Sequence, residues 1–276
     1  MKKGISIWAF KDVTLENAFR IAKTTSFDGV ELALDEQGEI NLNSTEQDIL
    51  RIKDTAAKEG VSLYSLATGL YWTYSLTSDD PGEREKAENI VRKQLDVASW
   101  LGCDTILVIP GMVTGLSGGC VVPYDVVYER AFNAIKRLAP YAEERNVTIG
   151  LENVWNKFLL SPIEMKQFID EINSPRVGAY FDVGNVMCDG YPEHWIKILG
   201  SRIAKVHFKD YKQSVRTLDG FVDLLNGDVN YPAVMQALDS VGYNDWVTAE
   251  VFPYKYHPEA LLKNTSQSMD YILNRK

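Results

Sequence analysis

Short apolar segments alternate with amphipathic helical segments along the whole chain of 276 residues, eight of each. The apolar segments are too hydrophobic to lie on an open surface, which is typical of strands covered on both faces. Alternation on this scale predicts a parallel sheet, and eight units in a chain of this length predict a closed (β/α)8 barrel, the TIM-barrel fold. Because no linker or repeat interrupts the pattern, residues 1–276 are predicted to form a single domain.

The bounds of the predicted elements follow from the residues that flank them. The strands are Ile5–Phe10, Gly29–Ala33, Val61–Ala67, Thr105–Ile109, Thr148–Glu152, Val177–Asp182, Ile203–His207 and Trp246–Glu250. The helices are one opened by Thr14, then Ser44–Glu59, Pro81–Leu101, Tyr124–Arg145, Ser161–Ile172, Pro192–Leu199, Tyr231–Val241 and one from Pro258. Gly60 is a stop signal, and Ser161 with Glu164 has the form of a capping box.

Composition and charge limit the kinds of partner. A formal net charge of -9 argues against nucleic acid, which requires a basic surface. No segment approaches the roughly 20 apolar residues needed to span a membrane. The three cysteines, Cys103, Cys120 and Cys188, are far apart, which favours reduced thiols in a cytoplasmic protein over a disulfide framework.

Four consecutive predicted strands end on a side chain that can bind a metal. These residues are Glu152, Asp182, His207 and Glu250. Singly, such residues also serve as turn caps, buried histidines or rim ion pairs. Together they would meet at the C-terminal mouth of the barrel, where functional side chains of this fold lie. Buried like charges raise one another's pKa and destabilise the fold unless they are neutralised, so we predict one bound divalent metal ion.

Ligand type and strand order predict how such a site works. Three oxygen donors and one nitrogen donor favour Mn²⁺, with Co²⁺, Mg²⁺ and Zn²⁺ left open. The strands of Glu152 and Glu250 are three apart in the ring, so the two carboxylates are expected to face each other, with the other two ligands between them. Two opposed carboxylates beside a Lewis acid favour proton abstraction next to a carbonyl.

Further candidates lie near the same strand ends. Trp8, Trp72 and Trp155 are expected to form an apolar wall for a sugar, and Lys209 shares the inward parity of His207, although a rim position is left open for it. Lys205 also has inward parity and is expected to pair with a buried acid. The long segments Gly69–Asp80 and Pro110–Val122 are predicted to close over a substrate.

The motifs at these strand ends resemble those of the xylose-isomerase-like barrel family over essentially the whole chain. They are Leu-Glu-Asn at 151–153, Phe-Asp-Val-Gly-Asn at 181–185, Val-His-Phe-Lys-Asp at 206–210, Ala-Glu-Val at 249–251 and the segment 226–234. The resemblance implies a metal-dependent sugar or sugar-phosphate isomerase or epimerase acting through an enediolate. It implies that Glu152, Asp182, His207 and Glu250 bind the metal and that the two glutamates are the acid and base.

The chain departs from the free-ketose 3-epimerases of this family at two positions. Asn185 stands where those enzymes usually have a histidine and is our candidate for substrate binding, and Phe158 stands where they carry a second glutamate. These departures favour the L-ribulose- and L-xylulose-5-phosphate 3-epimerase branch over the tagatose and psicose enzymes. With only three histidines in the chain, the DNA-repair branch and its histidine-rich metal cluster are not favoured.

Two other functions remain open from the sequence. A dehydratase of the inosose type shares the first proton abstraction, and a barrel that has lost catalysis would bind a carbohydrate only. Two opposed glutamates favour an enzyme, because a binding protein needs metal ligands but no acid–base pair. The substrate is therefore expected to be a small sugar or sugar phosphate, and a homo-oligomer, dimer or tetramer, is left open.

Overall fold

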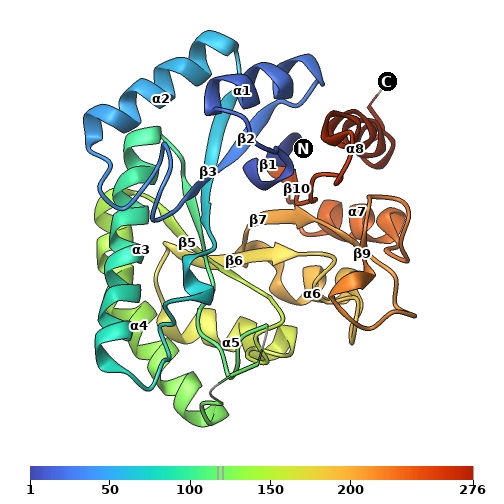
Figure 1. The fold of residues 1–276 in the computed structure, drawn as a ribbon. Helices are drawn as coiled ribbons and strands as arrows, with labels where there is room; N and C mark the ends of the chain where they lie inside the picture. Colours follow the sequence, from blue (N-terminus) through green and yellow to red (C-terminus); the bar gives the residue numbers. More distant parts are fainter. Residues whose placement is uncertain (117, 120, 276) are drawn as a thin grey trace.

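Parallel pairing between every pair of neighbouring strands closes the sheet into a ring, which confirms the predicted (β/α)8 barrel. The structure is a computed structural model that describes residues 1–116, 118–119 and 121–275. The strand order around the ring is β1-β10-β7-β6-β5-β4-β3-β2, and the helices lie outside it (Figure 1). The ends of β5, β6, β7 and β10 are therefore consecutive neighbours at one mouth of the barrel.

The elements have the following bounds. The barrel strands are β1 (Lys2–Ser6), β2 (Gly29–Leu34), β3 (Ser62–Thr68), β4 (Thr105–Val108), β5 (Thr148–Glu152), β6 (Val177–Asp182), β7 (Ile203–Phe208) and β10 (Trp246–Ala249). The α-helices are α1 (Leu15–Thr24), α2 (Glu46–Glu59), α3 (Pro81–Leu101), α4 (Tyr124–Arg145), α5 (Pro162–Ile172), α6 (Pro192–Leu199), α7 (Tyr231–Ser240) and α8 (Pro258–Ile272). The short 3-10 helices are η1 (Ile7–Ala9), η2 (Leu70–Trp72), η3 (Gly200–Arg202) and η4 (Leu218–Gly220).

The predicted first strand, Ile5–Phe10, is wrong in its position. β1 ends at Ser6, whose hydroxyl accepts a hydrogen bond from the backbone N–H of Trp8 and starts η1. The apolar run that suggested a longer strand is therefore a turn over the barrel end. This turn carries Trp8 to the mouth.

Only half of the predicted capping box forms at the start of α5. The hydroxyl of Ser161 accepts a hydrogen bond from the backbone N–H of Glu164. The Glu164 carboxylate instead accepts hydrogen bonds from the backbone N–H of Leu160 and the hydroxyl of Tyr124. These contacts tie the loop before α5 to the first turn of α4.

Side chains of unequal size fill the barrel interior. Gly150 on β5 leaves room for the ring of Tyr180, since a Cβ at Gly150 would lie only 3.0 Å from that ring. At the opposite end from the mouth, the Nζ atom of Lys205 lies 2.5 Å from Oδ2 of Asp245 and 2.8 Å from Oδ1 of Asp104. The predicted acidic partners of Lys205 therefore exist, but they are partly exposed, not buried.

The segment between β7 and α7 is held by one buried carboxylate. It contains the two-stranded antiparallel sheet of β8 (Asp210–Tyr211) and β9 (Phe221–Val222). Asp210 accepts hydrogen bonds from the backbone N–H groups of Tyr211, Leu225 and Val229. Gly227 makes this possible, because a Cβ there would lie 2.1 Å from Oδ1 of Asp210. The segment is thereby fixed at the edge of the mouth.

Two further findings concern membrane-spanning helices and the cysteines. Within the described ranges, no helix combines the length and apolar character required to cross a bilayer. Cys103 is buried and Cys188 is half-buried, and both are free thiols, whereas Cys120 lies outside the described residues.

Candidate metal centre and the cavity above it

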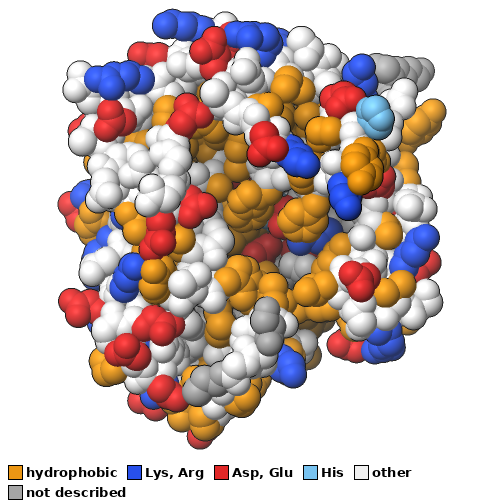
Figure 2. Space-filling view, in the orientation of Figure 1, with side chains coloured by type: hydrophobic (Ala, Val, Ile, Leu, Met, Phe, Trp, Pro, Cys, Tyr) orange, Lys and Arg blue, Asp and Glu red, His pale blue; other side chains and the backbone are white. Residues whose placement is uncertain are grey.

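Four neighbouring strands bring one acidic or imidazole side chain each to a common point at the mouth. One ligand atom from each of Glu152, Asp182, His207 and Glu250 lies within 4.8 Å of the other three. The Nδ1 atom of His207 is 3.4 Å from Oε1 of Glu152, 3.2 Å from Oε2 of Glu250 and 3.8 Å from Oδ2 of Asp182. Figure 2 shows this face of the molecule hollowed at its centre, with acidic side chains inside the hollow and hydrophobic ones around it. The predicted grouping is therefore present in the fold.

Two asparagines fix the carboxylate of Asp182. Asn153 accepts a hydrogen bond from the backbone N–H of Asp182 and donates one to its carbonyl. The backbone N–H of Asn185 donates to Oδ1 of Asp182 at 2.7 Å, while its side-chain amide donates to the carbonyl of Asn153. These bonds leave Oδ2 of Asp182 directed at the cluster.

Glu31 is a fourth acid at this site, and the sequence analysis missed it. It lies in the middle of β2 with no solvent exposure, and its Oε1 and Oε2 atoms are 3.0 and 3.2 Å from Nε2 of His207. Its carboxylate also accepts hydrogen bonds from the hydroxyls of Ser65 and Tyr180. An acid at an inward-facing position of an otherwise apolar strand was the available signal. A carboxylate on Nε2 fixes the imidazole ring and leaves Nδ1 facing the cluster.

Burial and the neighbouring charges shift the pKa values of the side chains in the cluster. Burial, with the neighbouring charges of Glu250 and Asp182, raises the pKa of Glu152 to about 7, and burial also raises the pKa of Asp182. Burial is the largest single influence on Glu250 and acts in the same direction, but the ammonium of Lys209 and the imidazole of His207 together outweigh it and lower the pKa of that carboxyl. For His207, burial opposes protonation, but the surrounding acids, Glu31 foremost, raise its pKa well above the ordinary value.

Lys209 points into the mouth, as its parity predicts. Its Nζ atom lies 2.7 Å from Oε2 of Glu250 and 3.4 Å from Oδ2 of Asp182, and only 8% of the residue is exposed. The contact is one-sided, because Lys209 lies next to Glu250 and Asp182 and not next to Glu152. The two glutamates at the mouth therefore differ in their electrostatic surroundings.

The cluster fits a divalent metal ion. Buried polar atoms normally have hydrogen-bond partners, yet three atoms here make no hydrogen bond within the described residues: Oδ2 of Asp182, Nδ1 of His207 and Oε2 of Glu250. The two carboxylate oxygens form ion pairs with Lys209. All three face one another. Several carboxylate oxygens and one imidazole nitrogen are a suitable donor set for Mn²⁺ and related ions, and they disfavour a structural zinc site.

A cavity of about 560 Å³ lies above the cluster, and all five predicted substrate-binding residues line it. These residues are Trp8, Trp72, Trp155, Asn185 and Lys209. Trp155 is fixed by a hydrogen bond from its Nε1 to the carbonyl of Asn185 and by ring contacts with Tyr211 and Phe221. The cavity thus combines an aromatic wall with two acids and a lysine at its base.

The family of the chain follows from a comparison with models of known families. Residues 19–273 match the family described as xylose isomerase-like TIM barrel. The chain belongs to this family. The resemblance seen in the strand-end motifs is therefore confirmed over nearly the full length.

Two curated relatives of this chain are named as sugar-phosphate epimerases. A putative L-ribulose-5-phosphate 3-epimerase of Haemophilus influenzae is 24% identical over 92% of this chain and 88% of its own length. An L-ribulose-5-phosphate 3-epimerase of Shigella flexneri is 26% identical over 81% of this chain and 77% of its own length.

Solved structures share the fold at lower identity. A structure of L-ribulose 3-epimerase has a TM-score of 0.83 at 19% identity, covering 99% of this chain and 94% of that one. A D-psicose 3-epimerase determined in the presence of D-fructose has a TM-score of 0.80 at 17% identity, covering 99% and 97%. A 3-keto-D-glucoside 4-epimerase from E. coli has a TM-score of 0.79 at 15% identity, covering 99% of each chain.

Phe158, one of the two departures noted in the sequence, has no polar role at the metal cluster. Its side chain is buried and makes edge-on ring contacts with Tyr124, Tyr128 and Phe168. These rings belong to α4 and α5, so Phe158 packs behind the loop after β5. At this position this chain therefore has a buried aromatic side chain and no acid.

Proposed function

We propose that this protein is a metal-dependent isomerase or epimerase of a keto sugar or a keto-sugar derivative. One observation carries the proposal: Glu152 and Glu250 converge from strands β5 and β10 on opposite sides of the two central ligands, at the base of a cavity. The names of the relatives, L-ribulose-5-phosphate 3-epimerases and keto-sugar epimerases, support the same reaction class.

In this proposal, Glu152, Asp182, His207 and Glu250 hold one divalent ion, with Mn²⁺ the first candidate. When bound, the ion polarises the substrate carbonyl and acidifies the neighbouring C–H. Glu31 keeps the imidazole of His207 oriented, and Asn153 with Asn185 keeps the carboxylate of Asp182 in place.

The proton transfers are assigned to the two glutamates. One of them removes the proton from the carbon next to the carbonyl, and the other returns a proton from the opposite face, so that the configuration is inverted with no net change in protons. Return of the proton to the neighbouring carbon instead gives aldose–ketose isomerisation.

The remaining cavity residues bind and orient the sugar. Trp8, Trp72 and Trp155 supply flat apolar surface for the carbon–hydrogen face of the ring. The ammonium of Lys209 and the amide of Asn185 lie at the base, where hydroxyl groups of a sugar need hydrogen-bond partners. The aromatic wall also excludes water from the carbanionic intermediate.

Exchange of substrate hydrogen for solvent deuterium tests the proposal. The Mn²⁺-loaded protein is incubated in D2O with keto sugars and their phosphates, and deuterium next to the carbonyl is followed by NMR. Glu152→Gln and Glu250→Gln should each reduce turnover by about 10²–10⁴-fold, the usual contribution of a general acid or base. Glu129→Gln, on an exposed face of α4, is the matched control.

One outcome contradicts the two-glutamate assignment. If both Gln variants keep near-normal turnover with the metal bound, the acid and base lie elsewhere. Formation of a dimer or tetramer stays a prediction, which sedimentation of the purified protein tests.

A further inference from the structure

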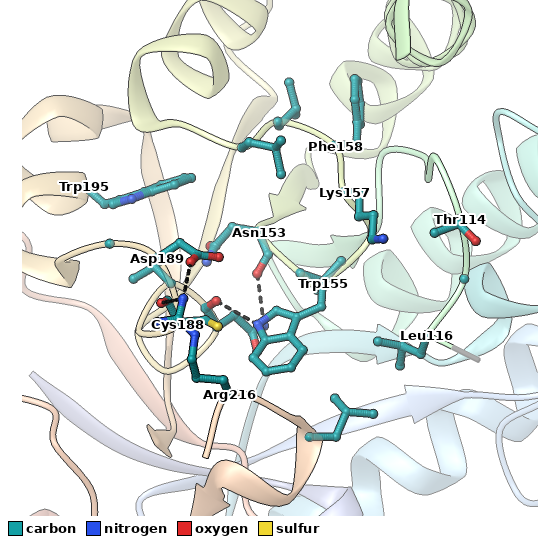
Figure 3. A pocket seen from close by; sticks show the side chains of 18 of the residues that line it. Thr114, Leu116, Asn153, Trp155, Lys157, Phe158, Cys188, Asp189, Trp195 and Arg216 are labelled. Atoms are coloured by element: carbon teal, nitrogen blue, oxygen red, sulfur yellow. Dashed lines mark hydrogen bonds and ion pairs between the residues drawn. The ribbon is translucent and has the colours of Figure 1, made fainter. Parts of the chain in front are cut away.

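A second chamber adjoins the cavity above the metal cluster. It has a volume of about 500 Å³ and is enclosed by the loops that follow β4, β5, β6 and β7. It shares Leu116, Val154, Trp155, Asn185 and Leu218 with the first cavity, so these five residues lie between the two spaces. Figure 3 shows Trp195 and Arg216 on one side of the chamber, Lys157 and Thr114 on the other, and Trp155 between them.

Its lining is largely aromatic and aliphatic, and its charges are nearly balanced. The half-buried Trp155 offers the larger indole surface, and Trp195, which is 7% exposed, offers a smaller one. The guanidinium of Arg216 forms an ion pair with Asp189, another lining residue, at 2.9 Å from its Oδ1 atom, and both side chains are exposed. Lys157 is the cation without a partner among the described residues of this chamber, and it is exposed. The Asp189 carboxylate would repel a phosphate, whereas the hydroxyl groups of an uncharged ring could donate hydrogen bonds to it.

The backbone of the chamber is strained at three lining residues. Lys157, Leu159 and Arg216 have φ values of 57°, 51° and 56°, in the left-handed region that side-chain-bearing residues rarely adopt. Such backbone conformations are disfavoured, and strain of this kind concentrates at ligand-binding sites. The two chamber cations are among the three, so the loops after β5 and β7 hold both at a conformational cost.

The volume of the first cavity limits the size of a ligand that this cavity can hold by itself. The first cavity alone falls in the range of roughly 300–1,000 Å³ that encloses one small ligand. A ligand confined to it would leave the aromatic faces of the second chamber uncovered. Trp155 lines both spaces, so a ligand bound over the metal cluster and extended past this indole would reach the chamber.

We propose that the substrate is a glycoside-like keto sugar: its carbonyl-bearing unit lies over the metal cluster, and a second, uncharged ring, a sugar or an aglycone, lies between Trp155 and Trp195. This inference rests on the proposed isomerase or epimerase function and specifies its substrate class. The second ring stacks on the indoles, and Lys157, Arg216 and Asp189 bind its hydroxyl groups.

Three ketoses differing in the group distant from the carbonyl test the inference. They are D-fructose, isomaltulose (fructose with a glucosyl group on O6) and L-ribulose 5-phosphate, each followed by deuterium exchange with Mn²⁺-loaded protein. We expect kcat/KM for isomaltulose to exceed that for D-fructose by about tenfold or more, the effect of one well-placed contact surface. Equal values, or a preference for the phosphate, overturn the proposal.

Substitutions at Cys188 test whether the preference for isomaltulose arises in the second chamber. Cys188 is half-buried, lines this chamber and does not line the first cavity. Cys188→Trp fills the chamber and should remove the preference for isomaltulose while leaving exchange of D-fructose unchanged. Cys188→Ala removes the thiol without filling space, and Ile163→Trp adds the same indole at an exposed position outside both cavities, so both should behave as wild type. A preference that survives Cys188→Trp overturns the assignment to this chamber. If this variant does not fold, Leu160→Trp, at a chamber residue that is 65% exposed, replaces it.

Binding separates failure of the inference from failure of the proposed function. Tryptophan fluorescence of the same protein is titrated with D-fructose and with isomaltulose, independently of turnover. Absence of exchange for every ketose rejects the proposed function alone. Equal dissociation constants for the two sugars reject the second chamber, and tighter binding of isomaltulose that Cys188→Trp abolishes supports it.

Discussion

Nε2 of His207 lies 3.0 Å from Oε1 of Glu31, although 176 positions separate the two residues in the chain. Both side chains are fully buried, and the same carboxylate accepts hydrogen bonds from Ser65 and Tyr180. One nitrogen of the imidazole is thus occupied by Glu31, and the other faces the three carboxylates of the cluster. The pairing across the barrel sets which nitrogen is available to a metal ion.

Glu31→Gln should weaken Mn²⁺ binding by about 10–100-fold, because loss of a carboxylate partner leaves a ligating histidine less basic and less well oriented. Calorimetric titration of the metal-free protein with MnCl2 measures this directly, without any substrate. Ser65→Ala removes a hydroxyl partner of Glu31 and leaves the His207 contact in place, so its effect should be smaller. Unchanged Mn²⁺ affinity in Glu31→Gln would show that the contact only packs the barrel interior.

Removal of either central ligand should abolish metal retention. Asp182→Ala and His207→Ala each delete one of the atoms that have no hydrogen-bond partner among the described residues. Metal analysis of protein purified without chelator should find about one equivalent of Mn²⁺ or a related divalent ion in the wild type and little in either variant. Asp219→Ala, at an exposed acid that lines the same cavity, should retain the metal.

The metal-free protein should lose stability as the pH rises from about 4.5 to about 7. Burial raises the pKa of Glu152 from 4.5 to about 7, so the folded state holds its proton more tightly than the unfolded state does. Below pH 4.5, Glu152 is protonated in both the folded and the unfolded state. Above the higher value the folded state carries a buried charge, which lowers the free energy of unfolding.

Urea unfolding in the presence of chelator at pH 5 and pH 8 measures this effect. Glu152→Gln, which mimics the protonated acid, should gain stability relative to the wild type at pH 8 more than at pH 5. Glu129→Gln should show no such difference. The same Glu152→Gln effect at both pH values would contradict the assignment.

Trp72→Ala should raise KM, lower kcat, or both, if the segments Gly69–Asp80 and Pro110–Val122 close over the substrate. Trp72 lines the cavity on the first of these segments, and the hydroxyl of Thr77 joins the two segments through the backbone N–H of Met112. Residues 117 and 120 of the second segment lie outside the described residues. Trp100→Ala, in the last turn of α3, is the control, and unchanged kinetics in Trp72→Ala would argue against a lid.

The parts of the site that local sequence determines were predictable. Strand periodicity places Glu152, Asp182 and His207 at strand ends, and barrel topology then brings strand ends together, whatever the distance along the chain. Inward parity also made Lys209 a candidate, with a rim position as the alternative. These inferences need only the alternation of side chains and the order of strands.

Contacts across the barrel could not be predicted from the local sequence. Glu31 lies in mid-strand, and its partners Ser65, Tyr180 and His207 come from three other strands, so no local pattern links them. The register of neighbouring strands and the size of interior side chains determine such contacts. The misplaced first strand has a different cause: one hydrogen bond to Ser6 ends the strand, and apolar periodicity continues past it.

Asp210 separates the residues that anchor the segment after β7 from the residues that line the second chamber. Its carboxylate holds backbone N–H groups at 211, 225 and 229, so both ends of the intervening segment are anchored by one side chain. Residues between these anchors, Arg216 and Leu218 among them, reach the second chamber. Substitution of these residues would therefore change the lining of the second chamber while the anchoring hydrogen bonds and the metal cluster stay as they are.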